Sequence, residues 1–261
     1  MELNLMTFNL RVNTPVDGSN AWPYRIRHAA AAIKKTAPLV VGTQEGTNAM
    51  LLDLDRELPG YSRLGEGRSG STNEEDRLHD ECCAIYYRHD MLAPVASGQF
   101  WLSETPDVPG SKSWDSSLPR ICTWACFEVK ASGRRFYAFN THFDHLGQRA
   151  REESARLMLE RIRRCREEDG IPAVLTGDLN AFPDNPAVVA LKEQLADAFD
   201  VLQEKVGRTF HAYEGGTEGQ PIDYLFATEG AEFTRTVVHR EHWEGVYPSD
   251  HYPVEAHVRL L

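Results

Sequence analysis

The sequence contains no apolar run long enough to cross a membrane. No stretch approaches the roughly 18 consecutive apolar residues that a spanning helix needs. The opening residues, MELNLMTFNLR, carry no basic region ahead of an apolar core, which a secretory signal peptide requires. The 19 glycines show no period of the collagen type. These absences predict a globular protein without membrane partners. Because a strand-like pattern begins almost at Met1, we expect a complete cytoplasmic protein.

Cysteine and positive charge are both scarce. The five cysteines form no CxxC pair and no even framework, which predicts reduced thiols in the core. The 28 lysines and arginines are outnumbered by 39 acidic residues, giving a net charge of −11. Proteins that bind long nucleic acids normally carry a positive field, so tight binding to long duplex DNA is not expected. Phosphate chemistry is not excluded, because a divalent metal ion can reverse the local field.

The 261 residues contain no repeat, low-complexity tract or dividing linker, which predicts a single domain over residues 1–261. Apolar spacing predicts helices over 23–37, 48–58 and 147–169, and from about 186. Strands are expected at 2–10, 39–43, 82–88, 96–102, 121–130, 135–141, 172–176, 222–227, 232–238 and 252–260. The polar stretch 66–81 is predicted to be a surface loop. This order of elements predicts an α/β fold, with sheets covered by helices.

Polar residues of the kinds used in catalysis stand where the predicted strands end. In PAVLTGDLNAFPDNP, residues 172–186, strand alternation points Asp178 and Asn180 the same way. Taken alone, this segment is equally well explained as a turn, because Asp, Asn and Gly are common turn formers. Other predicted strands end in Asn9, in Glu45 and in Asn140–His145, and Ser249–His251 stands just before the last predicted strand.

Together, these segments resemble the exonuclease–endonuclease–phosphatase superfamily, which has the deoxyribonuclease I-like fold. The matching elements, in order, are Asn9, Gln44–Glu45, Asn140–Thr141–His142, Gly177–Asp178–Leu179–Asn180, Ile222–Asp223–Tyr224 and Ser249–Asp250–His251. The resemblance extends from residue 6 to residue 251. Within the family, the chain looks most like an uncharacterised bacterial branch similar to deadenylase-type members, because of the segments FWLSETPDVPGSKSW and NTHFDH. The resemblance implies a four-layer α/β/β/α sandwich (α+β in some schemes), in which two packed mixed β-sheets are flanked by helices.

The resemblance also implies a divalent-metal-dependent phosphoester hydrolase of the phosphodiesterase type. Glu45, helped by Asn9 and Asp250, would hold Mg²⁺ or Mn²⁺, which are hard ions that prefer oxygen ligands. Asp178 would position or deprotonate the attacking water, and Asn180 would hold a phosphate oxygen.

Two histidine–acid pairs complete the implied machinery. His251 would bind the phosphate and be oriented by Asp223, which would favour its cationic form. His142 would also contact the substrate and would pair with Glu81. Arg120 is the candidate phosphate clamp, with an ordinary surface arginine as the alternative.

Three further residues distinguish this chain within the family pattern. Asp144 and His145 lie beside His142, where they either line the pocket or simply form a loop of this branch. Arg11 stands where some abasic-site nucleases of the family carry an acid, which argues against an abasic-site role.

Other functions compete with this interpretation. NTHFDH resembles the HxHxDH zinc signature of metallo-β-lactamase-like hydrolases with the first histidine replaced, but zinc chemistry leaves Glu45 and the SDH segment unexplained. A non-catalytic binding module is the third class. For a hydrolase we expect a monomer acting on a small phosphodiester, nucleotide or short single strand, with a nuclease on longer DNA or RNA as the alternative. Trp101, Trp114 and Phe182 either stack on such a substrate or belong to the core.

Overall fold

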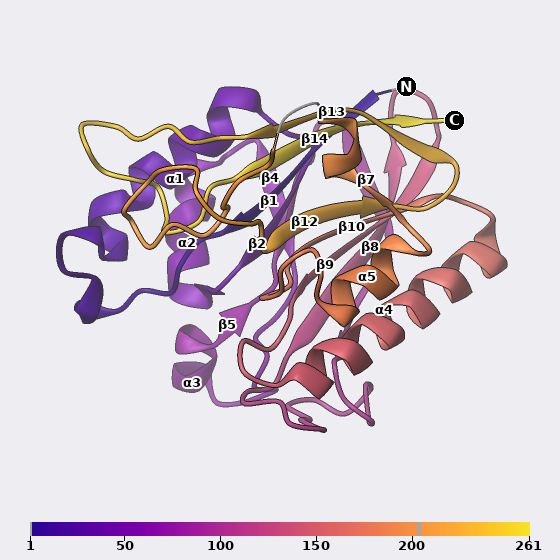
Figure 1. The fold of residues 1–261 in the computed structure, drawn as a ribbon, viewed down its shortest axis with the longest axis horizontal. Coiled ribbons are helices and arrows are strands. Elements are labelled where there is room, and N and C mark those ends of the chain that lie inside the picture. Colours follow the sequence, from indigo (N-terminus) through magenta and orange to yellow (C-terminus); the bar gives the residue numbers. More distant parts are fainter. Residues whose placement is uncertain (1, 203–204) are drawn as a thin grey trace.

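The computed structural model describes residues 2–202 and 205–261, and its centre is a pair of six-stranded mixed sheets (Figure 1). The first sheet has the order β13 (Ala231–Val238), β14 (Val254–Leu260), β1 (Glu2–Asn9), β2 (Val40–Gln44), β6 (Ile85–Arg88) and β4 (Tyr61–Leu64). The second has the order β11 (Ala196–Asp197), β12 (Asp223–Ala227), β10 (Ala173–Asp178), β9 (Arg135–His142), β8 (Ile121–Val129) and β7 (Leu92–Trp101). The parallel pairs β1–β2 and β9–β10 lie within these sheets, so their carboxyl ends meet at one edge.

Helices cover the outer faces of both sheets, which confirms the four-layer α/β/β/α sandwich. The first sheet is covered by α1 (Trp22–Thr36) and α2 (Asn48–Glu57), and the second by α4 (Gln148–Asp169) and α5 (Pro186–Lys192). Smaller elements are η1 (Pro15–Asn20), η2 (Ala198–Val201), α3 (Glu74–His79) and the short pair β3 (Gly46–Thr47) and β5 (Glu81–Cys82). No helix in the described part of the chain is long and apolar enough to span a bilayer.

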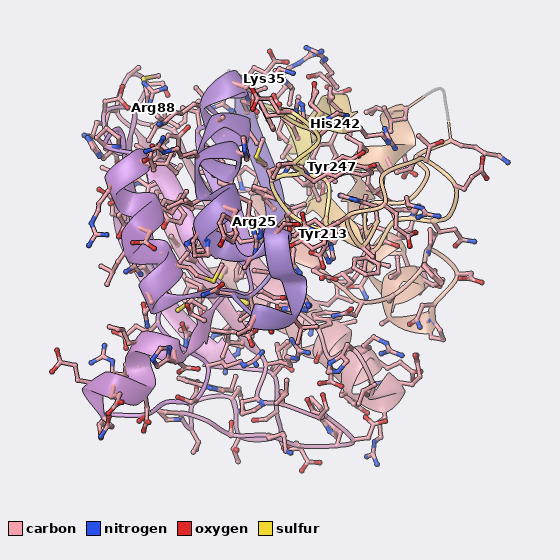
Figure 2. All side chains as sticks on the ribbon, turned by 90° about the vertical axis from the view of Figure 1, so that its left-hand side faces the viewer. Arg25, Lys35, Arg88, Tyr213, His242 and Tyr247 are labelled. Carbon is pink, nitrogen blue, oxygen red and sulfur yellow. The ribbon has the colours of Figure 1, made fainter. Side chains whose placement is uncertain are left out.

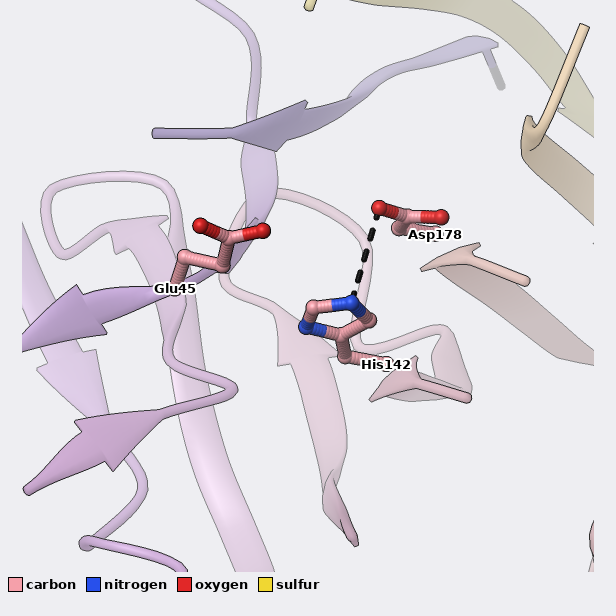
Figure 3. Close-up of side chains that lie close together, drawn as sticks. All are labelled: Glu45, His142 and Asp178. Atoms are coloured by element: carbon pink, nitrogen blue, oxygen red, sulfur yellow. Dashed lines mark ion pairs between the residues drawn. The ribbon is translucent and has the colours of Figure 1, made fainter. Parts of the chain in front are cut away.

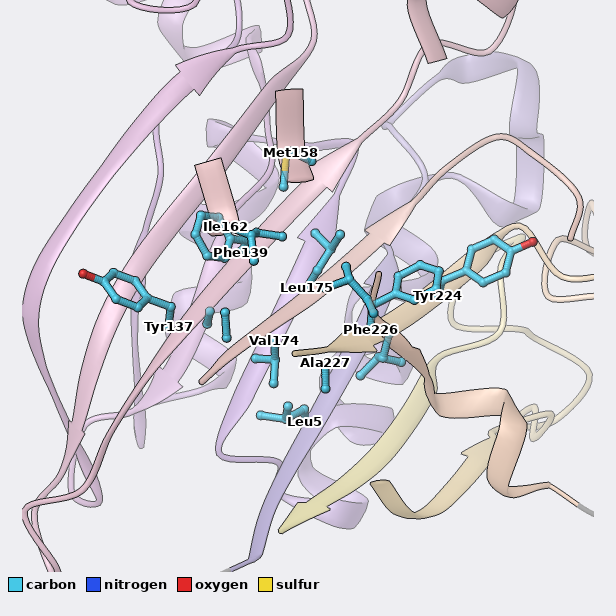
Figure 4. Close-up of a cluster of buried hydrophobic side chains, with 14 of the residues drawn as sticks. Leu5, Tyr137, Phe139, Met158, Ile162, Val174, Leu175, Tyr224, Phe226 and Ala227 are labelled. Atoms are coloured by element: carbon cyan, nitrogen blue, oxygen red, sulfur yellow. The ribbon is translucent and has the colours of Figure 1, made fainter. Parts of the chain in front are cut away.

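Alternation along the strands of the second sheet places their apolar side chains in two layers, one on each face of that sheet (Figure 4). On β10, Leu175 lies on the outer face beside Phe139 of β9, in the layer that also contains Met158 of α4. The neighbouring Val174 faces inward, where it meets Leu5 of β1. Both layers belong to one continuous cluster of buried side chains, so the two sheets and α4 are held in a fixed relation.

A buried polar bridge joins the sheets just below their carboxyl ends. Gln44 Nε2 donates to Asn140 Oδ1 at 2.7 Å, and Thr176 Oγ1 donates to the same oxygen at 3.1 Å. Asn140 Nδ2 donates in turn to the main-chain oxygens of Thr43, on β2, and of Ala84, just before β6. A Cβ atom at Gly42 would lie 2.1 Å from Thr176 Oγ1, so glycine is required there. Gln44 and Asn140 therefore align the sheets instead of contacting a substrate.

The predicted loop 66–81 contains the short helix α3, which the sequence pattern did not indicate. Asn73 caps this helix by accepting from the main-chain N–H groups of Glu75 and Asp76. None of its residues is buried, so it has no apolar face that a periodicity argument could detect. The other predicted helices and strands are present with shifted ends, although the strand expected over 82–88 divides into β5 and β6.

Candidate active site

The residues singled out by the sequence converge at one edge of the sheet pair. They surround a cavity of about 350 Å³ at the carboxyl ends of β1, β2, β9 and β10 and beside the segment that precedes β14. Its lining includes Glu45, Glu81, Arg120, His142, His145, Asp178, Asn180, Asp250 and His251, together with Arg11, Arg68, Leu118, Phe210 and Ile222. The bridge below the cavity explains why residues from separate strands arrive together.

Asp178 stands at the centre of this arrangement. Its Oδ2 atom accepts from Asn9 Nδ2 at 2.9 Å and lies 3.6 Å from His142 Nε2 and 3.8 Å from His251 Nε2. Its Oδ1 atom accepts from the main-chain N–H of Asn180 at 2.8 Å. Burial, reinforced by the nearby charge of Asp223, raises the pKa of Asp178 to about 7. A base with this pKa is suited to accept a proton near neutral pH.

His251 forms the predicted pair with Asp223. The distance from Nδ1 of the ring to Asp223 Oδ2 is 2.9 Å, and both side chains are buried. Burial alone would lower the pKa of His251, but Asp223, followed by Asp178 and Asp250, raises it to about 10. His251 is therefore a cation at neutral pH, with Nε2–H available as a donor.

His142 differs from His251 in its partners and in its charge. Its predicted pairing with Glu81 is wrong. Glu81 instead binds Arg68, with 2.6 Å between its Oε1 and Arg68 Nη2. Asn180 Nδ2 donates to His142 Nε2 at 2.9 Å and to the main-chain oxygen of Phe143 at 3.0 Å. Burial, followed by the charges of Arg120 and Arg68, lowers the pKa of His142 well below its ordinary value. His142 is thus neutral, and a phosphate oxygen would have to replace it as the acceptor of the Asn180 amide.

Glu45 provides a carboxylate suited to a metal ion. Its Oε1 atom accepts from Asn9 Nδ2 at 2.9 Å and its Oε2 atom accepts from the Val12 N–H at 3.0 Å. Burial opposes ionisation, but His251 and these two hydrogen bonds lower the pKa of Glu45 overall. Glu45, His142 and Asp178 place their ligand atoms within 4.8 Å of one another (Figure 3). An ionised oxygen donor in such a cluster suits Mg²⁺ or Mn²⁺.

The two other predicted ligands differ in their surroundings. Asp250 lines the cavity, and its Oδ2 atom lies 3.7 Å from Arg11 Nε. Asn9 directs its amide nitrogen at Glu45 and Asp178, while its Oδ1 accepts from the Arg11 N–H at 2.8 Å. In this geometry the Asn9 amide nitrogen orients the two carboxylates.

Arg120 is a buried cavity residue and not an ordinary surface arginine. It is 4% exposed, its Nη2 lies 2.9 Å from His145 Nδ1, and its Nε lies 3.4 Å from Asp144 Oδ2. His145 lines the cavity, whereas Asp144 lies behind Arg120 and accepts from Ser117 and from main-chain N–H groups at the start of α4. These bonds lower the pKa of Asp144 although burial opposes it. His145 therefore lines the pocket, whereas Asp144 belongs to the loop that supports it.

Arg25 is a site-forming residue that the sequence analysis missed. It is fully buried on α1, near Tyr213 (Figure 2), and donates to the main-chain oxygens of Leu10, Arg11, Asn20 and Pro248. Arg25 thereby connects the residues that follow Asn9, at the end of β1, with the segment that precedes Asp250. One signal was available: an arginine occupies the apolar stripe that continues through Ala29 and Ile33. Arg68, which approaches from the polar loop, had no such signal.

Comparison with known proteins agrees with this geometry. The sequence matches the model of the Endonuclease/Exonuclease/phosphatase family over residues 6–251. A Bacteroides thetaiotaomicron protein of that family is 33% identical, with a TM-score of 0.91 over 99% of this chain and 98% of that one. A mannosyl-6-phosphatase from Bacteroides thetaiotaomicron VPI-5482 is 34% identical, with a TM-score of 0.92 over 98% of this chain and 99% of that one.

More distant relatives share the fold or a part of the sequence. The human Nocturnin catalytic domain is 18% identical, with a TM-score of 0.77 over 100% of this chain and 94% of that one. An uncharacterized protein of Acanthamoeba polyphaga mimivirus is 29% identical over 142 residues, which is 46% of this chain but only 20% of that protein. The family match and the two-sheet fold lead to one conclusion: this chain belongs to the endonuclease/exonuclease/phosphatase family of phosphoester hydrolases.

Proposed function

We propose that this protein hydrolyses small phosphoesters in a reaction that depends on Mg²⁺ or Mn²⁺. The observation that carries the proposal is the position of Asp178 between a cationic and a neutral histidine. Asp178, with a pKa of about 7, can act as the base that accepts a proton from water. The cation beside it, His251, can donate a hydrogen bond to the phosphate.

The donor set fits a hard divalent ion. Glu45 and Asp250 would hold the ion through oxygen atoms, with Asn9 orienting Glu45, and the bound ion would neutralise part of the phosphate charge. The zinc alternative is not supported by the geometry. Among the described residues, each group that could hold a metal contains a single histidine, and Asp144 and His145 are both bound to Arg120.

The chain's own residues can then carry the hydrolysis. The oxygen of a water molecule forms a bond to phosphorus while its proton passes to Asp178, and the ester P–O bond breaks. The leaving alcohol oxygen takes up one proton from solvent, and Asp178 then releases its proton to solvent, so that ester and water give phosphate and free alcohol. His251 donates its Nε2–H to a phosphate oxygen, where negative charge is greatest in the transition state. Arg120 and Arg68, each already paired with an acid, place N–H donors on the cavity wall.

Small substrates are preferred in this proposal over long DNA or RNA. The cavity holds about 350 Å³, which is the size of a small-molecule site, and the net charge of −11 opposes long polyanions. The similarity to a mannosyl-6-phosphatase supports a monoester such as a sugar phosphate. A small phosphodiester remains the second candidate, because the same base and donors serve either ester.

The test is hydrolysis by the purified protein of sugar phosphates, p-nitrophenyl phosphate, bis-p-nitrophenyl phosphate and short oligonucleotides, with Mg²⁺ or Mn²⁺. We expect turnover of small phosphoesters that EDTA abolishes and that Asp178→Asn reduces by about 10²-fold or more. Glu255→Gln, which alters a buried acid paired with His239 outside the cavity, is the matched control. Activity that survives EDTA, or that is equal in Asp178→Asn and the wild type, would overturn the proposal.

A further inference from the structure

A second cavity of about 450 Å³ continues from the catalytic one. The two cavities share Asn180, Phe210 and Ile222, so a molecule bound at the catalytic residues can extend into the second cavity. The second cavity lies between the loop that follows β10 and the segment 208–222. None of its residues has a part in the hydrolytic step described above except Asn180.

Two exposed phenylalanines form an apolar surface in this cavity. Phe182 is 54% exposed and Phe210 is 44% exposed, although most large apolar side chains of this protein are buried. The Phe210 ring lies 5.0 Å from the His251 ring, so it stands directly between the phosphate donor and the second cavity. Tyr224 donates its hydroxyl proton to the main-chain oxygen of Ala181 at 2.9 Å, which fixes the loop that carries Phe182. Exposed aromatic surface at a fixed position is typical of a binding site.

The polar groups of the second cavity carry an excess of negative charge. Glu214 and Glu218 are exposed, and the cation among the lining residues, Arg208, is already engaged within its own segment. Its Nη1 lies 3.9 Å from Glu214 Oε2, and its Nε donates to the main-chain oxygen of Glu218. The catalytic cavity differs, because it holds three arginines and His251 beside its acids and is where the proposed divalent ion would bind. A phosphoryl group is therefore favoured on one side and a neutral group on the other.

We propose that the second cavity binds the leaving alcohol and that this alcohol is a neutral polyhydroxyl compound of hexose size. The C–H face of such a ring packs on Phe182 and Phe210, and its hydroxyl groups donate to the carboxylates of Glu214 and Glu218. A second phosphate on the alcohol, or the next phosphate of a nucleic acid, would meet those carboxylates and be repelled. This inference rests on the proposed hydrolase function and names its substrate class: monophosphates of neutral sugars.

The experiment compares three substrates with Mg²⁺: a hexose 6-phosphate, the corresponding hexose 1,6-bisphosphate, and acetyl phosphate, whose leaving group is too small to fill the second cavity. We expect kcat/KM for the monophosphate to exceed that for the bisphosphate by about 10-fold or more, the scale of one unfavourable charge contact. Phe182→Ala and Glu218→Gln should each lower the ratio of kcat/KM for hexose 6-phosphate to that for acetyl phosphate about 10-fold. Tyr24→Ala, an exposed aromatic on α1, and Glu193→Gln, an exposed acid after α5, are matched controls that keep the wild-type ratio.

A binding measurement separates this inference from the proposed function. Calorimetric titration of hexose 6-phosphate in EDTA reports binding without turnover. Weaker binding of hexose 6-phosphate to Phe182→Ala and Glu218→Gln supports the second cavity as the alcohol site. If binding is weakened but no hydrolysis is detected in the wild type, the proposed function is overturned and this inference is not. Unchanged binding and an unchanged substrate ratio in both variants would overturn the inference, and so would a wild-type preference for the bisphosphate or for an oligonucleotide.

Discussion

Replacing Asp223 with asparagine should remove the positive charge of His251 while leaving its ring in place. Burial alone would lower the pKa of His251, and Asp223 makes the largest of the acidic contributions that raise it to about 10. At pH 7.5 a group with this pKa is more than about 99% protonated, since each pH unit changes the ratio tenfold. Asparagine keeps an oxygen near Nδ1 but carries no charge. We therefore expect the pKa of His251 to fall toward or below its ordinary value of 6.5.

The loss of charge should appear mainly in kcat. A neutral His251 donates a weaker hydrogen bond to the phosphate, and this bond matters most in the transition state. We expect His251→Ala to lower kcat by about 10²-fold or more and Asp223→Asn to reproduce part of that loss. The double variant should be little worse than His251→Ala, because the two residues act as one unit.

Two measurements check this reasoning. Imidazole NMR titration of the metal-free protein gives the pKa of His251, whose signal is assigned with His251→Ala. Steady-state kinetics of the two single variants and the double variant give the coupling energy. Glu255→Gln controls for the loss of a buried histidine–acid pair, because His239 Nε2 lies 2.6 Å from Glu255 Oε2 away from the cavity. A high pKa of His251 in Asp223→Asn, or additive losses in the double variant, would refute the assigned role of Asp223.

Three further predictions follow from the same geometry. Glu45→Gln should weaken Mg²⁺ binding by about 10-fold or more in a calorimetric titration, and unchanged affinity would exclude Glu45 as a ligand. Arg25→Met removes the donor of four main-chain oxygens, those of Leu10 and Pro248 in buried bonds, so urea unfolding should show a loss of about 3–5 kcal/mol, against about 0.5 kcal/mol or less for the exposed Arg27→Met. Iodoacetamide should leave turnover intact, because burial raises the pKa of the thiols, to about 12 for Cys82; loss of activity that tracks modification of one cysteine would contradict this.

Much of the fold was predictable because its main elements have clear periodicity. The helix α4 buries Ala155, Met158, Leu159 and Ile162 on one face, and this spacing is visible in the sequence. The short helix α3 was not predictable, because its residues are all exposed. In the site, the acid–histidine pair of Asp223 and His251 was correctly predicted from the family pattern. The partner of His142 was not, because it depends on the left-handed backbone of Asn180, which has a φ of 47° and brings its amide to the ring.

The net charge of the chain is a poor guide to the charge of its site. The protein carries −11 overall, yet Arg11, Arg68 and Arg120 all line the catalytic cavity. Each arginine is bound by an acid: Arg11 by Asp17, Arg68 by Glu81 and Arg120 by Asp144. Part of the acidic surplus therefore holds these cations in place. An arginine held in this way loses little conformational entropy when a phosphate arrives, but its charge is already matched. The positive charge that remains for the phosphate must then come from His251, whose pKa three nearby carboxylates raise against the effect of burial, and from a divalent ion at Glu45 and Asp250. The same acidic surplus discourages long polyanions from the surface, which makes a small phosphoester the substrate that this distribution of charge suits best.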